Sequence, residues 1–133
     1  MGVKSCSCET VPVFVFPCSG AADVGEISDR AARRLSRDGI ARMFCLAGIG
    51  GRVAPMLAAA RTASGLLALD GCPMNCASRT LTKAGFKGVL RVALSDIGLS
   101  KGNSSPTEAN VSKVVKAAQK KVAAVRKECG KRS

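Results

Sequence analysis

Three cysteines recur at a fixed interval along this chain. Cys18, Cys45 and Cys72 are 27 residues apart, and each lies at the end of a short apolar run. A fourth cysteine, Cys76, stands four positions after Cys72. Since each thiol occupies the same stage of a repeating segment, the spacing predicts successive strand–turn–helix units with a cysteine after each strand.

The first unit begins with residues 13–16, Val-Phe-Val-Phe. An uncharged run of valine and phenylalanine is typical of a strand buried on both faces, as in a parallel sheet. Apolar residues at helical spacing follow after Cys18, and they are Val24, Ile27, Ala31 and Leu35. Gly39 is placed to end this helix, because glycine tolerates positive φ.

The second unit repeats the plan. We expect a strand over residues 40–44, with Cys45 at its end. A glycine-rich turn over residues 48–51 follows, and then a helix through residues 56–63 that stops at Gly65. The sequence therefore predicts a second crossover from one strand to the next.

The third unit has a strand over residues 66–69, a turn over 70–76 and a helix over 77–84. A fourth strand over residues 89–94 contains Arg91, and a charged residue of this kind is typical of an edge strand. Strands that alternate with helices at this spacing favour a parallel sheet with helices on both faces. We predict a three-layer αβα fold with a mostly parallel four-stranded sheet, of the Rossmann or flavodoxin type.

A long basic amphipathic helix should complete the domain. Ser105 is the expected N-cap, with Pro106 at the first helical position and Glu108 completing a capping box. Its apolar stripe consists of Val111, Val114, Val115, Ala118, Val122 and Val125. We expect residues 11–133 to form a single α/β domain and residues 1–10 to be a flexible, cysteine-containing leader.

Composition limits both the location and the chemistry. The 133 residues contain no apolar run of the ~18 residues that a membrane span requires, and the N-terminus has no signal-peptide pattern. We therefore expect a cytoplasmic protein without a membrane partner, whose thiols stay reduced. Histidine is absent, which removes the commonest general base and every mixed Cys/His zinc site. We do not predict an enzyme.

The predicted topology brings the cysteines to one place. In a parallel sheet the residues that follow each strand emerge at the carboxyl edge, where ligands bind in open α/β sheets. Adjacent strands lie about 4.8 Å apart, so Cys18, Cys45, Cys72 and Cys76 can converge on one ion. Four thiolates on Zn²⁺ would form a closed site with a formal charge of about −2. The sequence therefore predicts a zinc-binding protein with a structural, sensing or transfer role.

Other uses of these thiols stay open. Any single cysteine can be a small buried hydrophobe, and the Cys-x₃-Cys spacing by itself is a weak metal motif. Cys72 and Cys76 can instead serve a thiol redox or sulfur-carrier protein, with thiolates stabilised at a helix N-terminus. Four thiolates also hold iron–sulfur clusters.

Three motifs in order resemble the DGC-domain proteins, a family named for its Asp-Gly-Cys motif. They are residues 17–27, Pro-Cys-Ser-Gly-Ala-Ala-Asp-Val-Gly-Glu-Ile; residues 45–50, Cys-Leu-Ala-Gly-Ile-Gly; and residues 70–76, Asp-Gly-Cys-Pro-Met-Asn-Cys. The resemblance extends from about residue 13 to residue 101. It implies a zinc-binding domain chelated by Cys18, Cys45, Cys72 and Cys76, and it implies no reaction.

The remaining cysteines and the aspartates have simpler interpretations. Cys6 and Cys8 precede the first strand and enter from the opposite edge, so we assign them to the leader. Cys129 lies at the far end of the last helix, as part of its apolar stripe. Asp70 and Asp96 follow strands and are most simply turn formers, although they can also act as outer-shell acceptors for a metal site.

The chain is basic, with 21 Lys and Arg against 9 Asp and Glu and a net charge of +12. From Lys101 onward there are nine basic and two acidic residues, a net charge of +7. A basic helix can bind nucleic acid, but the chain has no Trp or Tyr and only four Phe, so it lacks a stacking platform for single strands. A solvated helix face is the simpler interpretation.

Overall fold

The structure is a computed structural model that describes residues 11–132, and in the last helix it describes side chains as far as Glu128. Cys6, Cys8 and the side chain of Cys129 lie outside this part. The elements in chain order are β1 (Val13–Pro17), α2 (Asp23–Arg37), β2 (Arg42–Met43), α3 (Leu46–Gly50), α4 (Ala54–Arg61), β3 (Gly65–Asp70), α5 (Cys76–Lys83), β4 (Leu90–Ala93), the short 3₁₀ helix η2 (Leu94–Ile97) and α6 (Glu108–Arg132).

The four strands form one sheet in the order β2-β1-β3-β4, and every pair is parallel. The predicted parallel α/β fold is confirmed. β1 and β3 are paired along their whole length, from Val13 opposite Gly65 to Pro17 opposite Leu69. Arg91 lies in β4, which is an edge strand as its charge predicted.

The strand order reverses direction beside β1. The chain passes from β1 to β2 on one side and then crosses to β3 on the other side of β1. The crevice between the ends of β1 and β3 is therefore a topological switch point, which is the place where open α/β sheets bind ligands.

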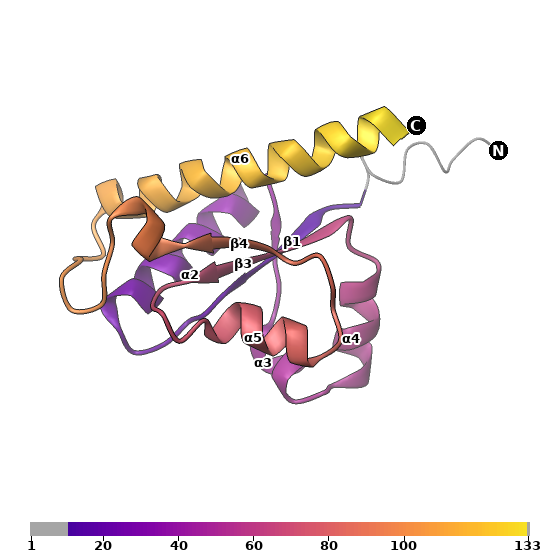
Figure 1. The fold of residues 1–133 in the computed structure, drawn as a ribbon, viewed down its shortest axis with the longest axis horizontal. Coiled ribbons are helices and arrows are strands. Elements are labelled where there is room, and N and C mark those ends of the chain that lie inside the picture. The colour runs from indigo at the N-terminus through magenta and orange to yellow at the C-terminus, as the bar shows by residue number, and fades with distance from the viewer. Residues whose placement is uncertain (1–10, 133) are drawn as a thin grey trace.

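Alternating residues of β1 enter two separate cores. Val13 and Val15 pack with α2 and α6, whereas Phe14 and Phe16 pack with α3, α4 and α5. Figure 1 shows α6 along one side of the sheet and α3, α4 and α5 along the other. The three layers therefore follow from the uncharged β1 sequence, since both of its faces are buried.

The second unit differs from its prediction. The strand predicted over residues 40–44 is reduced to Arg42–Met43, because the N–H groups of Ile40 and Ala41 donate to the carbonyl of Leu35 at 3.0 and 3.3 Å. These two residues are therefore held against the last turn of α2, in the loop that follows it. Gly65 does not stop a helix but begins β3.

The glycine-rich segment after Cys45 is helical and not the predicted turn. α3 begins directly after Cys45, whose sulfur accepts a hydrogen bond from the N–H of Gly48 at 3.3 Å. A Cβ on Gly48 would lie 2.9 Å from Cγ of Met56. This glycine therefore permits close packing on the next helix, α4.

The last helix begins two residues later than the capping box predicted. Thr107 provides the cap, since its Oγ1 accepts the N–H of Asn110 at 3.2 Å. Five residues of the predicted stripe are buried, and Val125 is half-buried. Among the helices of the described part, none is long and apolar enough to cross a membrane.

Candidate functional site

The four predicted ligands all lie at the carboxyl edge of the sheet. Cys18 directly follows β1, and Cys45 lies between β2 and α3. Cys72 is in the loop after β3, and Cys76 is the first residue of α5. All four are free thiols, of which Cys18 and Cys72 are half-buried and Cys45 and Cys76 are exposed.

Three of these cysteines border one cavity of about 480 Å³ at the switch point between β1 and β3. Cys18 lies on the β1 side, and Cys72 and Cys76 lie on the β3 side. The rest of the lining consists of small residues from the start of α2, together with Gly71, Met74 and Lys101. Met74 is 66% exposed at the mouth of the cavity.

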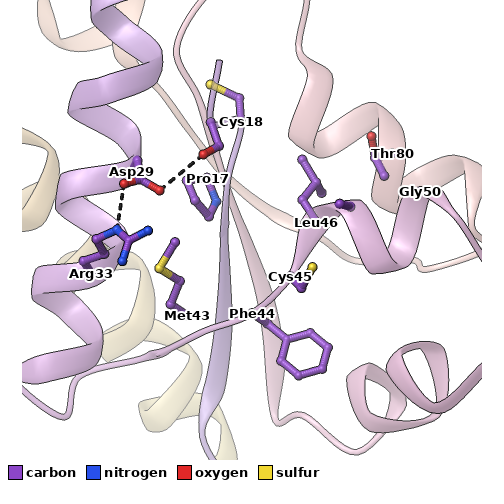
Figure 2. Close-up of a pocket in the computed structure, with 12 residues that line it drawn as sticks. Pro17, Cys18, Asp29, Arg33, Met43, Phe44, Cys45, Leu46, Gly50 and Thr80 are labelled. Carbon is purple, nitrogen blue, oxygen red and sulfur yellow. Dashed lines mark hydrogen bonds and ion pairs between the residues drawn. The ribbon is translucent and has the colours of Figure 1, made fainter. Parts of the chain in front are cut away.

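Cys45 borders a different cavity of about 680 Å³, next to the end of β2. Cys18 lies between the two cavities and lines both of them. Figure 2 shows the thiols of Cys18 and Cys45 pointing in different directions. The opposite wall carries a polar cluster in which Asp29 accepts from Ser19 Oγ at 3.2 Å and from Arg33 Nε at 2.7 Å.

The thiols are therefore neighbours at one edge, and they are not gathered as tightly as metal ligands. Within residues 11–132, no three Cys, Asp or Glu side chains are close enough together to hold a metal ion. The chemistry of the donor set nevertheless fits a soft or borderline metal, because thiolate sulfur is the ligand that Zn²⁺ and iron–sulfur clusters share.

A buried carboxylate holds the loop that carries Cys72 and Cys76. Asp70 is 1% exposed and accepts from the N–H groups of Ala77 at 3.0 Å and Ser78 at 3.3 Å. It also accepts from Ser78 Oγ at 2.6 Å and from Arg91 Nε at 2.8 Å. Asp70 therefore caps α5 from the end of β3 and closes residues 71–75 into a tight loop.

Arg91 also contacts the other end of the same loop. Its guanidinium donates to Oδ1 of Asn75, which adopts a left-handed backbone with φ of 57°. Asparagine is one of the residues that tolerates this conformation best. Arg91 thus joins Asp70 to Asn75 and fixes the backbone on either side of Cys72.

Gly71 is required by close packing on α2. A Cβ at this position would lie 2.9 Å from the carbonyl oxygen of Val24 and 3.0 Å from its carbonyl carbon. The N–H of Gly71 also donates to the sulfur of Cys18 at 3.4 Å. The Asp-Gly-Cys segment therefore combines a helix cap, a close approach to α2 and a thiol on the cavity.

The backbone of Cys18 is likewise fixed to β3, since its N–H donates to the carbonyl of Leu69 at 3.0 Å. Cys45 follows Phe44, whose ring stacks on Phe14 with centroids 4.6 Å apart. The N–H of Phe44 donates to the carbonyl of Val15 at 3.0 Å. The backbone before each of these cysteines is therefore held by the sheet.

Sequence reasoning underestimated Asp70, which it treated as a turn former. The signal that could have identified its role is an aspartate at the end of a buried strand together with a single arginine, Arg91, in the next strand. Asp96 differs from Asp70, because it is exposed within η2.

The fold and the site together describe an α/β protein with a cysteine-lined crevice at the switch point of its parallel sheet. The DGC-domain family matches residues 14–118, and this chain belongs to that family. It is also 38% identical over 96 residues to the "Anaerobic and virulence modulator AnvM" of Pseudomonas aeruginosa. The aligned region covers 72% of this chain and 73% of AnvM. No solved structure matches the chain.

Proposed function

We propose that this protein binds one Zn²⁺ ion through the thiolates of Cys18, Cys45, Cys72 and Cys76. The observation that carries the proposal is the crevice between β1 and β3, which three of these thiols border. This crevice is where the topology of the sheet favours a ligand.

Zinc binding would require the four thiols to move toward one another, because no three potential ligands of the described residues are close enough together to hold an ion. Cys45 and Cys72 follow the two strands on either side of β1, so about 10 Å separates those strands. With metal–sulfur bonds of about 2.3 Å, a central ion beside Cys18 lies within reach of cysteine side chains from both neighbours. The strand order therefore keeps the four thiols at one edge of the sheet, and zinc would draw them together there.

The role that fits this site is metal sensing or transfer in the cytoplasm. A closed four-thiolate site leaves no position for a catalytic water, and the chain has no histidine to act as a base. The relative from P. aeruginosa is named as a modulator and not as an enzyme. A metal ion that changes the arrangement of the loops at the carboxyl edge of the sheet would serve a sensing role.

Metal analysis of the protein purified without added zinc tests the proposal. We expect one equivalent of zinc, and each of Cys18→Ser, Cys45→Ser, Cys72→Ser and Cys76→Ser should lower the zinc content. Cys6→Ser and Cys129→Ser are the matched controls and should retain it. Zinc content that is unchanged in all four variants would contradict the proposal.

A thiol redox or sulfur-carrier function is the second candidate. Cys76 is exposed at the first position of α5, and it borders the same cavity as Cys72. Rapid and reversible oxidation of these two thiols in metal-free protein, with no zinc bound after purification, would favour this function over the first.

A further inference from the structure

Two helices on one side of the sheet have basic outer surfaces that the proposed metal site does not use. α2 and α6 pack in the same core and contact each other. Arg34 Nη1 donates to Ser112 Oγ at 3.1 Å near the start of α6, and Arg126 Nη2 donates to the carbonyl of Ile40 at 3.2 Å near its end. The two helices therefore lie side by side, and their outer surfaces are continuous.

The outer surface of α6 is a row of exposed lysines. They recur at intervals of three, four and seven residues, which places them on one face of the helix. They are Lys113, Lys116, Lys120 and Lys127. The buried Val111 and Val122 lie on the opposite face. Within the described part of the chain these four lysines form no ion pair, so their charges face solvent.

The outer surface of α2 is a row of arginines with the same periodicity. They are Arg30, Arg33, Arg34 and Arg37. All four line one cavity of about 240 Å³, together with Glu108 and Val111 at the start of α6. The cavity therefore lies where the two helices meet, and guanidinium groups form most of its wall. We call the four arginines and the four lysines the basic face.

Acidic residues neutralise only part of the charge of the two helices. α2 and the described side chains of α6 contain ten Lys or Arg and five Asp or Glu, a net charge of +5. Three of the four arginines form ion pairs with nearby carboxylates, and their own side chains are between 35% and 65% exposed. Ion pairs that solvent reaches are weak, so these guanidinium groups can also bind phosphate oxygens.

The dimensions of the basic face fit a polymer with closely spaced negative charges. Lys113 and Lys127 are about 21 Å apart along the helix, at a rise of about 1.5 Å per residue. A nucleic acid duplex carries one negative charge per about 1.7 Å of its axis, so this length faces about 12 phosphates. The row of lysines can therefore follow the duplex backbone over several phosphates.

The composition of the basic face argues against other anionic partners. The large hydrophobic residues that are exposed in the described part are Val53 and Met74, and neither lies on α2 or α6. The face therefore lacks the apolar anchors that a membrane surface or a folded protein partner would use. The chain has no Trp or Tyr on which the bases of a single strand could stack. A duplex backbone requires neither feature.

We propose that the basic face of α2 and α6 binds the phosphate backbone of double-stranded nucleic acid. Lysines and arginines contact phosphates, so this binding selects no base sequence. The sequence of α6 by itself favours a solvated face, and the structure adds the arginines of α2 beside it. The inference goes beyond the proposed function, because none of the four lysines lines either of the described cavities that contain cysteines.

Fluorescence anisotropy with a labelled DNA duplex of mixed sequence, measured at several salt concentrations, tests the inference on the full chain. The wild type should bind, and its affinity should fall steeply as salt increases. Replacement of all four lysines (Lys113→Gln, Lys116→Gln, Lys120→Gln and Lys127→Gln) should weaken binding by about tenfold or more at low salt. The slope of log affinity against log salt should decrease by about 1 for each lysine that contacts a phosphate.

The matched control removes the same charge from the other side of the sheet. It replaces four exposed basic residues on and near α4 and α5: Arg61→Gln, Arg79→Gln, Lys83→Gln and Lys87→Gln. This variant should retain most of the affinity and the salt slope, and circular dichroism checks that both variants are folded. Equal losses in the two variants would overturn the proposal, because net charge alone would then explain binding. Absence of duplex binding by the wild type, or tighter binding to vesicles of anionic phospholipid or to single strands, would also overturn it.

Discussion

The guanidinium of Arg91 donates to the carboxylate of Asp70 at 2.8 Å, and this contact joins the edge strand β4 to the end of β3. The Asp70 side chain is fully buried, whereas that of Arg91 is 40% exposed. A solvated charge in the edge strand is thereby linked to the loop that carries two of the four cysteines. Asp70 therefore contributes both to the stability of the domain and to the shape of the loop that carries Cys72 and Cys76.

Asp70→Asn should destabilise the domain by about 2 kcal/mol. All four partners of Asp70 are donors, and an amide presents an NH₂ group that cannot accept from them. Urea denaturation measures the change. Asp96→Asn removes an exposed aspartate and should change the free energy of unfolding by less than about 0.5 kcal/mol. Equal effects of the two substitutions would show that Asp70 does not act as a cap.

Gly71→Ala should destabilise the domain by about 1–3 kcal/mol, because the new Cβ would meet the backbone of Val24. Gly20→Ala is the matched control at the same edge, since nothing lies within 4 Å of a Cβ built there. Thermal unfolding of the two variants distinguishes them. A Gly71→Ala protein as stable as Gly20→Ala would contradict the close approach.

The start of α6 provides a test of capping. Thr107→Ala should cost about 1 kcal/mol, because it removes the acceptor for the N–H of Asn110. Ser105→Ala should cost much less, because Ser105 uses its backbone carbonyl to accept from Thr107 and Asn110. A larger decrease in the free energy of unfolding for Ser105→Ala than for Thr107→Ala would contradict the Thr107 cap and support the capping box that the sequence predicted.

Asp23 makes the stability of the domain depend on pH. The N–H groups of Gly102 and Ser104 hold the pKa of Asp23 below its ordinary value. A carboxylate with a lowered pKa in the folded state stabilises the fold above its unfolded pKa of about 3.9. This contribution is lost as the pH falls through the lower folded value. The stability difference between the wild type and Asp23→Asn should therefore be largest near neutrality and should disappear at the acid end of a pH series; a constant difference would contradict it.

The fold class was predictable because the pattern that specifies it is local. The uncharged β1 sequence and the repeated strand–turn–helix plan predicted a buried parallel sheet, and both core faces of β1 confirm it. Gly39 and Gly85 adopt positive φ of 72° and 95° after α2 and α5, as residues that end helices often do.

The errors arose where tertiary contacts override local preference. Glycines after Cys45 predicted a turn, but the Cys45 cap and the contact of Gly48 with Met56 stabilise α3. The burial of Asp70 depends on a pairing with Arg91, 21 positions away, which no local pattern contains. The sequence placed the cysteines at one edge, but the division of that edge into two cavities follows from the side chains around Cys18.

The most direct test of the central claim is equilibrium dialysis of the reduced protein against Zn²⁺, compared with the double variant Cys72→Ser/Cys76→Ser. The wild-type chain should bind one equivalent tightly, and the double variant, once circular dichroism shows that it is folded, should bind none. Absence of tight zinc binding by the wild type, or one equivalent retained by the double variant, would contradict a metal site at the carboxyl edge of the sheet.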